Sequence, residues 1–87
     1  MTSIFSILCD TLNHYFDHCP GGLVSVANIC KNKLFAFYGY KYGLRETIEQ
    51  YLYTLGSKGN EYVSYSKKTK QVKLLKKITN KKLSDYK

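Results

Sequence analysis

Apolar side chains recur every three or four residues near the start of the chain, which is the spacing of an amphipathic helix. The predicted helix covers residues 3–17, and Thr2 or Ser3 can cap its first turn. Its apolar positions are Ile4, Leu8, Leu12, Tyr15 and Phe16. Pro20-Gly21-Gly22 follows, and this tripeptide ends the helix and forces a turn.

A second and clearer amphipathic pattern covers residues 44–56. One apolar stripe runs along it, formed by Leu44, Ile48, Tyr51, Leu52 and Leu55. Arg45, Gln50 and Tyr53 fall outside the stripe and are therefore expected to face solvent. The helix is expected to stop, with a left-handed cap, at the glycines Gly56 and Gly59.

Apolar and polar residues alternate in the stretch 61–77, which is the period of a β-strand. Two alternating runs flank the polar segment Lys67-Lys68-Thr69-Lys70. If these four residues form the loop, apolar residues face each other across it, and the pairs are Tyr65–Val72 and Val63–Leu74. Register and apolar face then agree, so the pattern predicts a β-hairpin with a lysine-rich tip.

The stretch 23–42 fits two descriptions. Leu23 to Cys30 can form either a short helix or a strand, because its apolar residues share a helical face while several are β-branched. Lys31-Asn32-Lys33 predicts a turn, and the strongly aromatic segment from Leu34 to Tyr42 predicts extended backbone. On such a strand Phe35 and Phe37 point one way, and the other face carries Tyr38, Tyr40 and Tyr42.

The charge of the chain is concentrated in its last third. The 87 residues carry 14 Lys and Arg against 6 Asp and Glu, a net charge of +8. Residues 1–57 are neutral overall, so the whole excess lies in residues 58–87. Clustered charge of one sign repels itself, and a polyanion is its commonest partner. A chain of this length makes one domain, expected to span residues 1–77 and to be followed by a basic tail, residues 78–87.

The cysteines and histidines give little sign of a catalytic or metal site. Cys9, Cys19 and Cys30 are an odd number without CxxC spacing, which predicts free thiols in a reducing compartment. His14 and His18 are four residues apart on the first helix, so their rings can share a metal with Cys19 beside them. No Glu stands where a zinc protease needs one, and no second Cys pair closes the site. We therefore expect no metal, no cofactor and no enzymatic activity.

The sequence also bears on location. Its first residues lack the basic start and apolar run of a secretory signal. Its uninterrupted apolar runs are far shorter than the ~20 residues that a membrane span needs. We therefore expect an intracellular protein, cytoplasmic or nuclear, without a membrane partner.

The second helix and the hairpin together resemble the recognition helix and wing of winged helix-turn-helix DNA-binding domains. The helix reads Arg45-Glu46-Thr47-Ile48-Glu49-Gln50-Tyr51-Leu52-Tyr53-Thr54-Leu55-Gly56. Its polar-Thr-Ile start, its two leucines three residues apart and its following glycine are features that this family often shows. Upstream, Val26-Ala27-Asn28-Ile29 is similar to the Ala-x-x-Ile of the helix that precedes the recognition helix. The resemblance covers about residues 24–75, with one departure: the connection from Lys31 to Gly43 is longer and more aromatic than the family's short turn.

This resemblance implies a small α+β, winged-helix-like domain with a C-terminal β-hairpin wing. The helix 44–56 would enter the major groove of double-stranded DNA, and the wing would contact phosphates or the minor groove. The protein would then be a small transcriptional regulator, with a homodimer as one acting form. The candidate contact residues are Arg45, Gln50, Tyr53, Lys58, Lys67, Lys68, Lys70, Lys73, Lys76 and Lys77. Glu46 and Glu49 on the same helix oppose this interpretation, because both would lie near phosphates or bases.

Two other interpretations stay open. If residues 23–42 form two strands, the order becomes αββαββ and the fold a two-layer sandwich. Its tyrosine face, formed by Tyr38, Tyr40 and Tyr42, could then stack the bases of single-stranded RNA. Alternatively, the basic hairpin binds an acidic protein surface, and the chain is a small interaction or inhibitor module.

Overall fold

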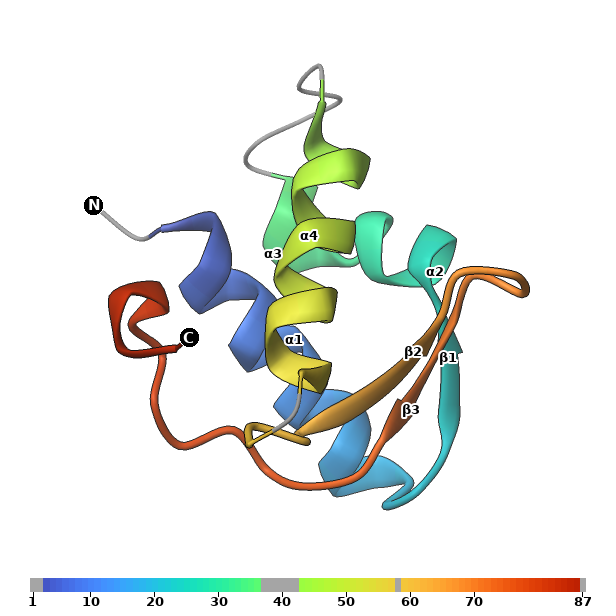
Figure 1. The fold of residues 1–87 in the computed structure, drawn as a ribbon. Coiled ribbons are helices and arrows are strands. Elements are labelled where there is room, and N and C mark those ends of the chain that lie inside the picture. Colours follow the sequence, from blue (N-terminus) through green and yellow to red (C-terminus); the bar gives the residue numbers. More distant parts are fainter. Residues whose placement is uncertain (1–2, 37–42, 58, 87) are drawn as a thin grey trace.

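A helix, a strand, three further helices and a hairpin follow one another in the computed structural model, which describes residues 3–36, 43–57 and 59–86 (Figure 1). The elements are α1 (Ile4–His18), β1 (Leu23–Ser25), α2 (Val26–Cys30), α3 (Lys33–Ala36), α4 (Leu44–Gly56), β2 (Val63–Ser66), β3 (Gln71–Leu74) and the 3₁₀ turn η1 (Leu83–Asp85). The chain thus forms a small α+β domain with one antiparallel sheet of three strands.

Both predicted amphipathic helices are confirmed. In α1, the Ser3 hydroxyl accepts a hydrogen bond from the Ser6 amide at 3.1 Å, which caps the first turn as expected. The bounds of α4 are those that the sequence predicts. Its expected left-handed cap is wrong, however, because Ser57, directly after the helix, is extended. The left-handed glycines nearest to the helix are Gly43 before it and Gly59 beyond it.

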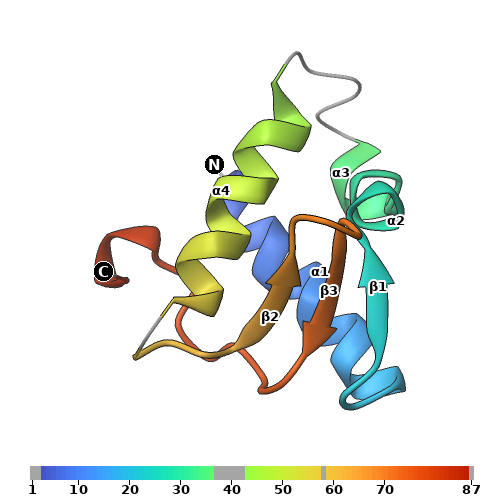
Figure 2. The ribbon, with the colours of Figure 1, turned by 45° about the vertical axis from the view of Figure 1, so that its right-hand side comes forward.

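The predicted hairpin is confirmed together with its register. Val63 lies opposite Leu74 and Tyr65 opposite Val72, so the loop consists of the four predicted residues 67–70. The short strand β1 pairs with the other side of β3, which gives the order β1-β3-β2 (Figure 2). β1 and β2 are therefore the two edges of the sheet.

In the described part of the ambiguous stretch, residues 23–36, one short strand is followed by two short helices. Leu23–Ser25 forms a strand and Val26–Cys30 a helix, so both descriptions of this segment hold for part of it. The Ser25 hydroxyl accepts a hydrogen bond from the Asn28 amide at 3.1 Å, which is the N-cap that makes the change from strand to helix.

The extended segment predicted from Leu34 is wrong over its described part, because α3 is helical and turns Phe35 into the core. Aromatic residues suit strands, but burial of one large ring here decides the local structure. The αββαββ sandwich falls with it, since the described part of 23–42 holds one strand of three residues. The predicted tyrosine face at residues 38, 40 and 42 lies outside the described residues.

The core lies between the sheet and the helices. Alternation puts Val24, Val72 and Tyr65 in one row on the inner face of the sheet, while Leu23, Lys73 and Ser64 form a row on the outer face. The helices α1 and α4 both contact the sheet from the inner side. The largest fully buried side chains are Phe5, Phe35, Leu8, Leu12, Ile29, Ile48, Leu52, Leu55 and Ile78.

The C-terminal segment contacts α1 through Ile78 and Tyr86, so the packed domain extends past the predicted boundary at residue 77. Ile78 is buried, and its backbone makes two buried hydrogen bonds with the Asn13 side-chain amide, of 2.7 and 2.8 Å. Further on, the Tyr86 ring contacts the Phe5 ring edge-on, with ring centres 5.4 Å apart.

In the part of the chain that is described, no helix has the length and apolar character needed to cross a bilayer.

Candidate nucleic-acid interface

The outward side of α4 carries the first group of predicted contact residues. Arg45 and Gln50 are exposed, and Tyr53 keeps 48% of its surface accessible. Arg45, Glu49 and Tyr53 follow one another at intervals of four residues, so they form one row along the helix. Within this row the Arg45 Nε atom lies 3.9 Å from the Glu49 carboxylate. Both side chains are partly exposed, at 49% and 25%, so the ion pair contributes little to the stability of the fold.

Tyr65 of β2 lies beside this row, and the sequence did not mark it as a site residue. Its ring meets the Tyr53 ring edge-on, with centroids 5.2 Å apart and an interplanar angle of 80°. The Tyr65 hydroxyl is buried and has no hydrogen-bond partner of normal geometry among the described residues. Burial, and then the negative charge of the nearby Glu49, raise the pKa of Tyr65. The alternation of β2 predicts an inward Tyr65, but only the edge position of the strand brings it against α4.

The hairpin tip carries the second group. Lys67, Lys68 and Lys70 are all exposed, and none of them forms an ion pair with a described acidic residue. The tip is held at its base: the Lys70 carbonyl accepts a hydrogen bond from the Val26 amide at 3.0 Å, which ties the loop to the start of α2. Lys70 itself has a left-handed backbone, with φ of 55°. Three adjacent cations without acidic partners favour a polyanion as ligand.

The other predicted lysines do not join these two groups. Lys73 projects from the outer face of the sheet, in register with Leu23 and Ser64. Lys76 and Lys77 follow the end of β3 and lie at the opposite end of the hairpin from its tip. Each has a local partner: the Lys76 ammonium lies 5.3 Å from the centre of the Tyr62 ring, and the Lys77 ammonium 3.6 Å from the Asp17 carboxylate. Lys58 lies outside the described residues.

The two groups differ in charge. Arg45 is the one cation of α4, whereas Glu46 and Glu49 are both acidic, so the helix carries a net charge of −1. The tip carries three positive charges on four residues. The positive charge of this surface is therefore concentrated at the tip, while α4 offers hydrogen-bonding groups and an aromatic ring.

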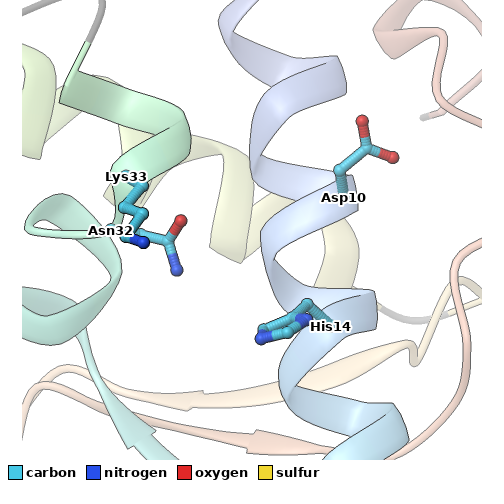
Figure 3. A pocket seen from close by; sticks show the side chains of 4 residues that line it. All are labelled: Asp10, His14, Asn32 and Lys33. Atoms are coloured by element: carbon cyan, nitrogen blue, oxygen red, sulfur yellow. The ribbon is translucent and has the colours of Figure 1, made fainter.

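A separate cleft of about 590 Å³ lies between α1 and the α2–α3 connection (Figure 3). Its described lining consists of Asp10, His14, Asn32 and Lys33. Asp10 also forms an ion pair with Lys81, which lies on the C-terminal segment. One acidic group already paired and one histidine make a weak binding set, so the cleft adds no chemistry that the sequence had not suggested.

His14 and His18 are close together on α1. The ring centres of His14 and His18 lie 4.4 Å apart, and a ring nitrogen of His18 is 2.9 Å from the His14 carbonyl oxygen. Over the described residues, no three His, Cys, Asp or Glu side chains come together as a metal would need. The arrangement thus offers at most two adjacent imidazoles.

All three cysteines are free, as the odd number predicts. Cys9 is buried in the core, Cys19 is exposed after α1 and Cys30 is half-buried. Burial, reinforced by the neighbouring Asp10 carboxylate, raises the pKa of the Cys9 thiol to about 12. Cys9 is therefore a protonated core residue at neutral pH and a poor nucleophile.

Comparison with known proteins finds no match: no family model, no curated protein and no solved structure is significantly similar to this chain. What the chain does is therefore inferred from its own residues, and the surface that stands out is formed by the outward side of α4 and the hairpin tip.

Proposed function

We propose that this protein binds double-stranded DNA through α4 and the β2–β3 hairpin, in the manner of a winged helix, and acts as a small transcriptional regulator. The observation that carries the proposal is the hairpin tip, where Lys67, Lys68 and Lys70 are exposed and pair with no acidic residue of the described part of the chain. Lysines in such a position release counterions when they meet phosphates, and this release drives binding to DNA.

The order of the elements supports the proposal. A helix pair, α2 and α4, precedes a hairpin whose first strand packs on the second helix of the pair. The short α3 and the segment after it stand where the family has a tight turn. The α4 face adds Arg45 and Gln50, whose side chains can hydrogen-bond to base edges in the major groove.

Two sets of three lysines allow a test matched in charge. Lys67→Ala, Lys68→Ala and Lys70→Ala together remove the tip charge, whereas Lys76→Ala, Lys77→Ala and Lys82→Ala together remove three charges from the segment that follows β3. All six side chains are exposed, so we expect both variants to stay folded. Fluorescence anisotropy with a labelled duplex should show strong weakening for the tip variant and a much smaller effect for the control.

Equal weakening by the two variants would mean that net charge alone causes binding, and the proposed interface would be wrong. Failure of the unaltered protein to bind duplex DNA at low salt would remove the proposed function altogether. Binding of an acidic protein in its place would favour an interaction module.

A further inference from the structure

The aromatic pair of Tyr53 and Tyr65 is the feature of this surface that binding to the phosphate backbone does not explain. Tyr53 projects from α4 with about half of its surface exposed, at 48%. Tyr65 lies behind it on the edge strand β2, and the T-shaped contact of 5.2 Å fixes the orientation of the Tyr53 ring. The ring is thus held in place while still open to solvent.

The support behind Tyr53 is itself fixed. Tyr65 lies opposite Val72 in the sheet register, and Val72 is fully buried in the core. The buried Tyr65 hydroxyl faces the Glu49 side chain, which also lies 3.9 Å from Arg45. Because these groups are ordered before any ligand arrives, a partner that uses the Tyr53 ring loses little entropy in ordering it.

A ring of this kind suits the face of a nucleobase. Base–aromatic stacking contributes about 1–3 kcal/mol per base and is the usual way in which proteins hold unpaired bases. In a continuous duplex the base faces are covered by their neighbours, and only base edges and phosphates are accessible. A base becomes available to Tyr53 only where it is unpaired, and extruding it costs least at a mismatch, bulge or gap.

The acidic residues of α4 fit the same ligand. A carboxylate beside the ring repels phosphates but accepts hydrogen bonds from the exocyclic amino group of cytosine or adenine. Glu49 is one helical turn before Tyr53, and its side chain is 25% exposed. The residue that counts against major-groove binding therefore becomes a partner for an unpaired base.

We propose that Tyr53, held by Tyr65, stacks on an unpaired base, so that the protein prefers duplex DNA carrying a bulged cytosine or adenine over the continuous duplex. This inference rests on the proposed binding of DNA. It divides the work between the two groups of residues: the tip lysines hold the flanking duplex, and the α4 row selects the exposed base.

The test compares two labelled duplexes that differ only by one bulged adenine. Anisotropy titrations of the unaltered protein should show tighter binding of the bulged duplex by between about 5- and 150-fold, the range that corresponds to one stacked base. Tyr53→Ala should abolish this preference, so that the variant binds the bulged and the continuous duplex with equal affinity. Tyr53→Phe keeps the ring and should keep the preference.

Two further arms separate stacking from a structural role. With 2-aminopurine as the bulged base, its fluorescence should be quenched by the unaltered protein and by Tyr53→Phe, and not by Tyr53→Ala. A bulged thymine, which lacks an amino group, should bind less well than adenine, and Glu49→Gln should reduce that difference.

The outcomes are distinct. Equal binding of both duplexes by the unaltered protein overturns this inference and leaves the proposed function intact, as does a bulge preference that survives in Tyr53→Ala. Absence of binding to either duplex overturns both.

Discussion

Asn13 joins the first helix to the end of the chain. Its side-chain amide donates to the Ile78 carbonyl and accepts from the Ile78 amide, and both hydrogen bonds are buried. The Asn13 side chain thus gives a hydrogen-bond partner to both backbone groups of Ile78, and these two groups give partners to Asn13. The polar side chain can therefore be buried without leaving these groups unpaired.

Replacement of Asn13 by Ala should therefore destabilise the protein by about 2–4 kcal/mol, since both backbone groups of Ile78 lose their partner in a buried site. The free energy of unfolding from urea titration measures this. Asn28→Ala is the matched control: Asn28 is exposed on α2, and its loss should change stability by less than about 0.5 kcal/mol. Similar values for the two variants would show that the Asn13 contact is not formed.

Cys9 makes the stability of the fold sensitive to alkali. Its pKa rises from an ordinary value of 9.0 to about 12, chiefly by burial. The buried thiol stays neutral to a higher pH than the thiol of the unfolded chain. The folded state therefore keeps its full stability only while the thiol of the unfolded chain is neutral as well. The stabilising effect is thus fully present below pH 9.0 and is lost as the pH rises towards about 12.

We predict that the free energy of unfolding of Cys9→Ala falls less steeply between these two pH values than that of the unaltered protein. All other titratable groups are common to both proteins, so their contributions cancel in the comparison. Parallel curves would contradict the burial of an uncharged thiol at this position.

Arg45 and the tip lysines should differ in what they contribute to binding. Arg45 is exposed on α4, and a bidentate contact of an arginine with guanine gives about 1–3 kcal/mol of discrimination between bases. After selection of a preferred duplex from a random pool, Arg45→Ala should reduce the preference over unrelated DNA more than the non-specific affinity. Lys67→Ala should instead weaken binding to all sequences alike. A preference that survives in Arg45→Ala would exclude this residue from base recognition.

The packing of α4 on β2 depends on the absence of a side chain at Gly56. A Cβ atom at this position would lie 2.9 Å from the Val63 carbonyl oxygen, which is closer than real contacts allow. Since the obstacle is backbone, the strand would have to shift away from the helix. The close approach of Gly56 to Val63 therefore sets how the end of α4 lies against the start of β2.

The sign of the stability change in Gly56→Ala tests this close approach. Helix propensity alone predicts that alanine stabilises a helical position by about 0.5–1 kcal/mol. The contact with Val63 predicts destabilisation by about 1–3 kcal/mol, as for other overpacked sites. Thermal or urea unfolding decides between them, and a more stable variant would contradict the close approach.

How much the sequence predicted depends on how local the signal was. The two long helices follow from apolar spacing within single segments, and the hairpin register follows from pairing across a four-residue loop. The stretch after Gly22 was ambiguous because β1 forms only by pairing with β3, some fifty positions further along the chain. Phe35 misled the prediction for the same reason, since its burial depends on packing against distant elements.

The sequence predicts which residues are candidates for binding, but not which of them lie together on the surface. Charge and helical position indicate ten residues. The structure divides the described ones among the α4 face, the hairpin tip, the outer sheet face and the far end of the hairpin. Tyr65 was missed because its role comes from a contact with Tyr53 that no local pattern encodes. Pairing of Lys77 with Asp17 and of Lys81 with Asp10 likewise joins residues far apart in the sequence.

Over the whole domain, the ion pairs of Lys77 with Asp17 and of Lys81 with Asp10 leave the unpaired positive charge concentrated at the hairpin tip. The acids of α1 lie beside lysines of the C-terminal segment, whereas the tip lysines have no acidic partner among the described residues. Far fewer lysines than the net charge of +8 suggests are therefore expected to meet the phosphates. The number engaged can be measured from the salt dependence of binding, because each phosphate contact contributes about −0.9 to the slope of log affinity against log salt.

The decisive measurement is this slope for a mixed-sequence duplex, determined for the unaltered protein, the tip variant and the matched control variant. Three tip lysines predict a slope of about −3 for the unaltered protein and for the control with Lys76, Lys77 and Lys82 replaced. The variant with Lys67, Lys68 and Lys70 replaced should give a slope close to zero. A flat curve for the unaltered protein, or a slope that the control variant reduces as much as the tip variant does, would contradict DNA binding through the hairpin tip.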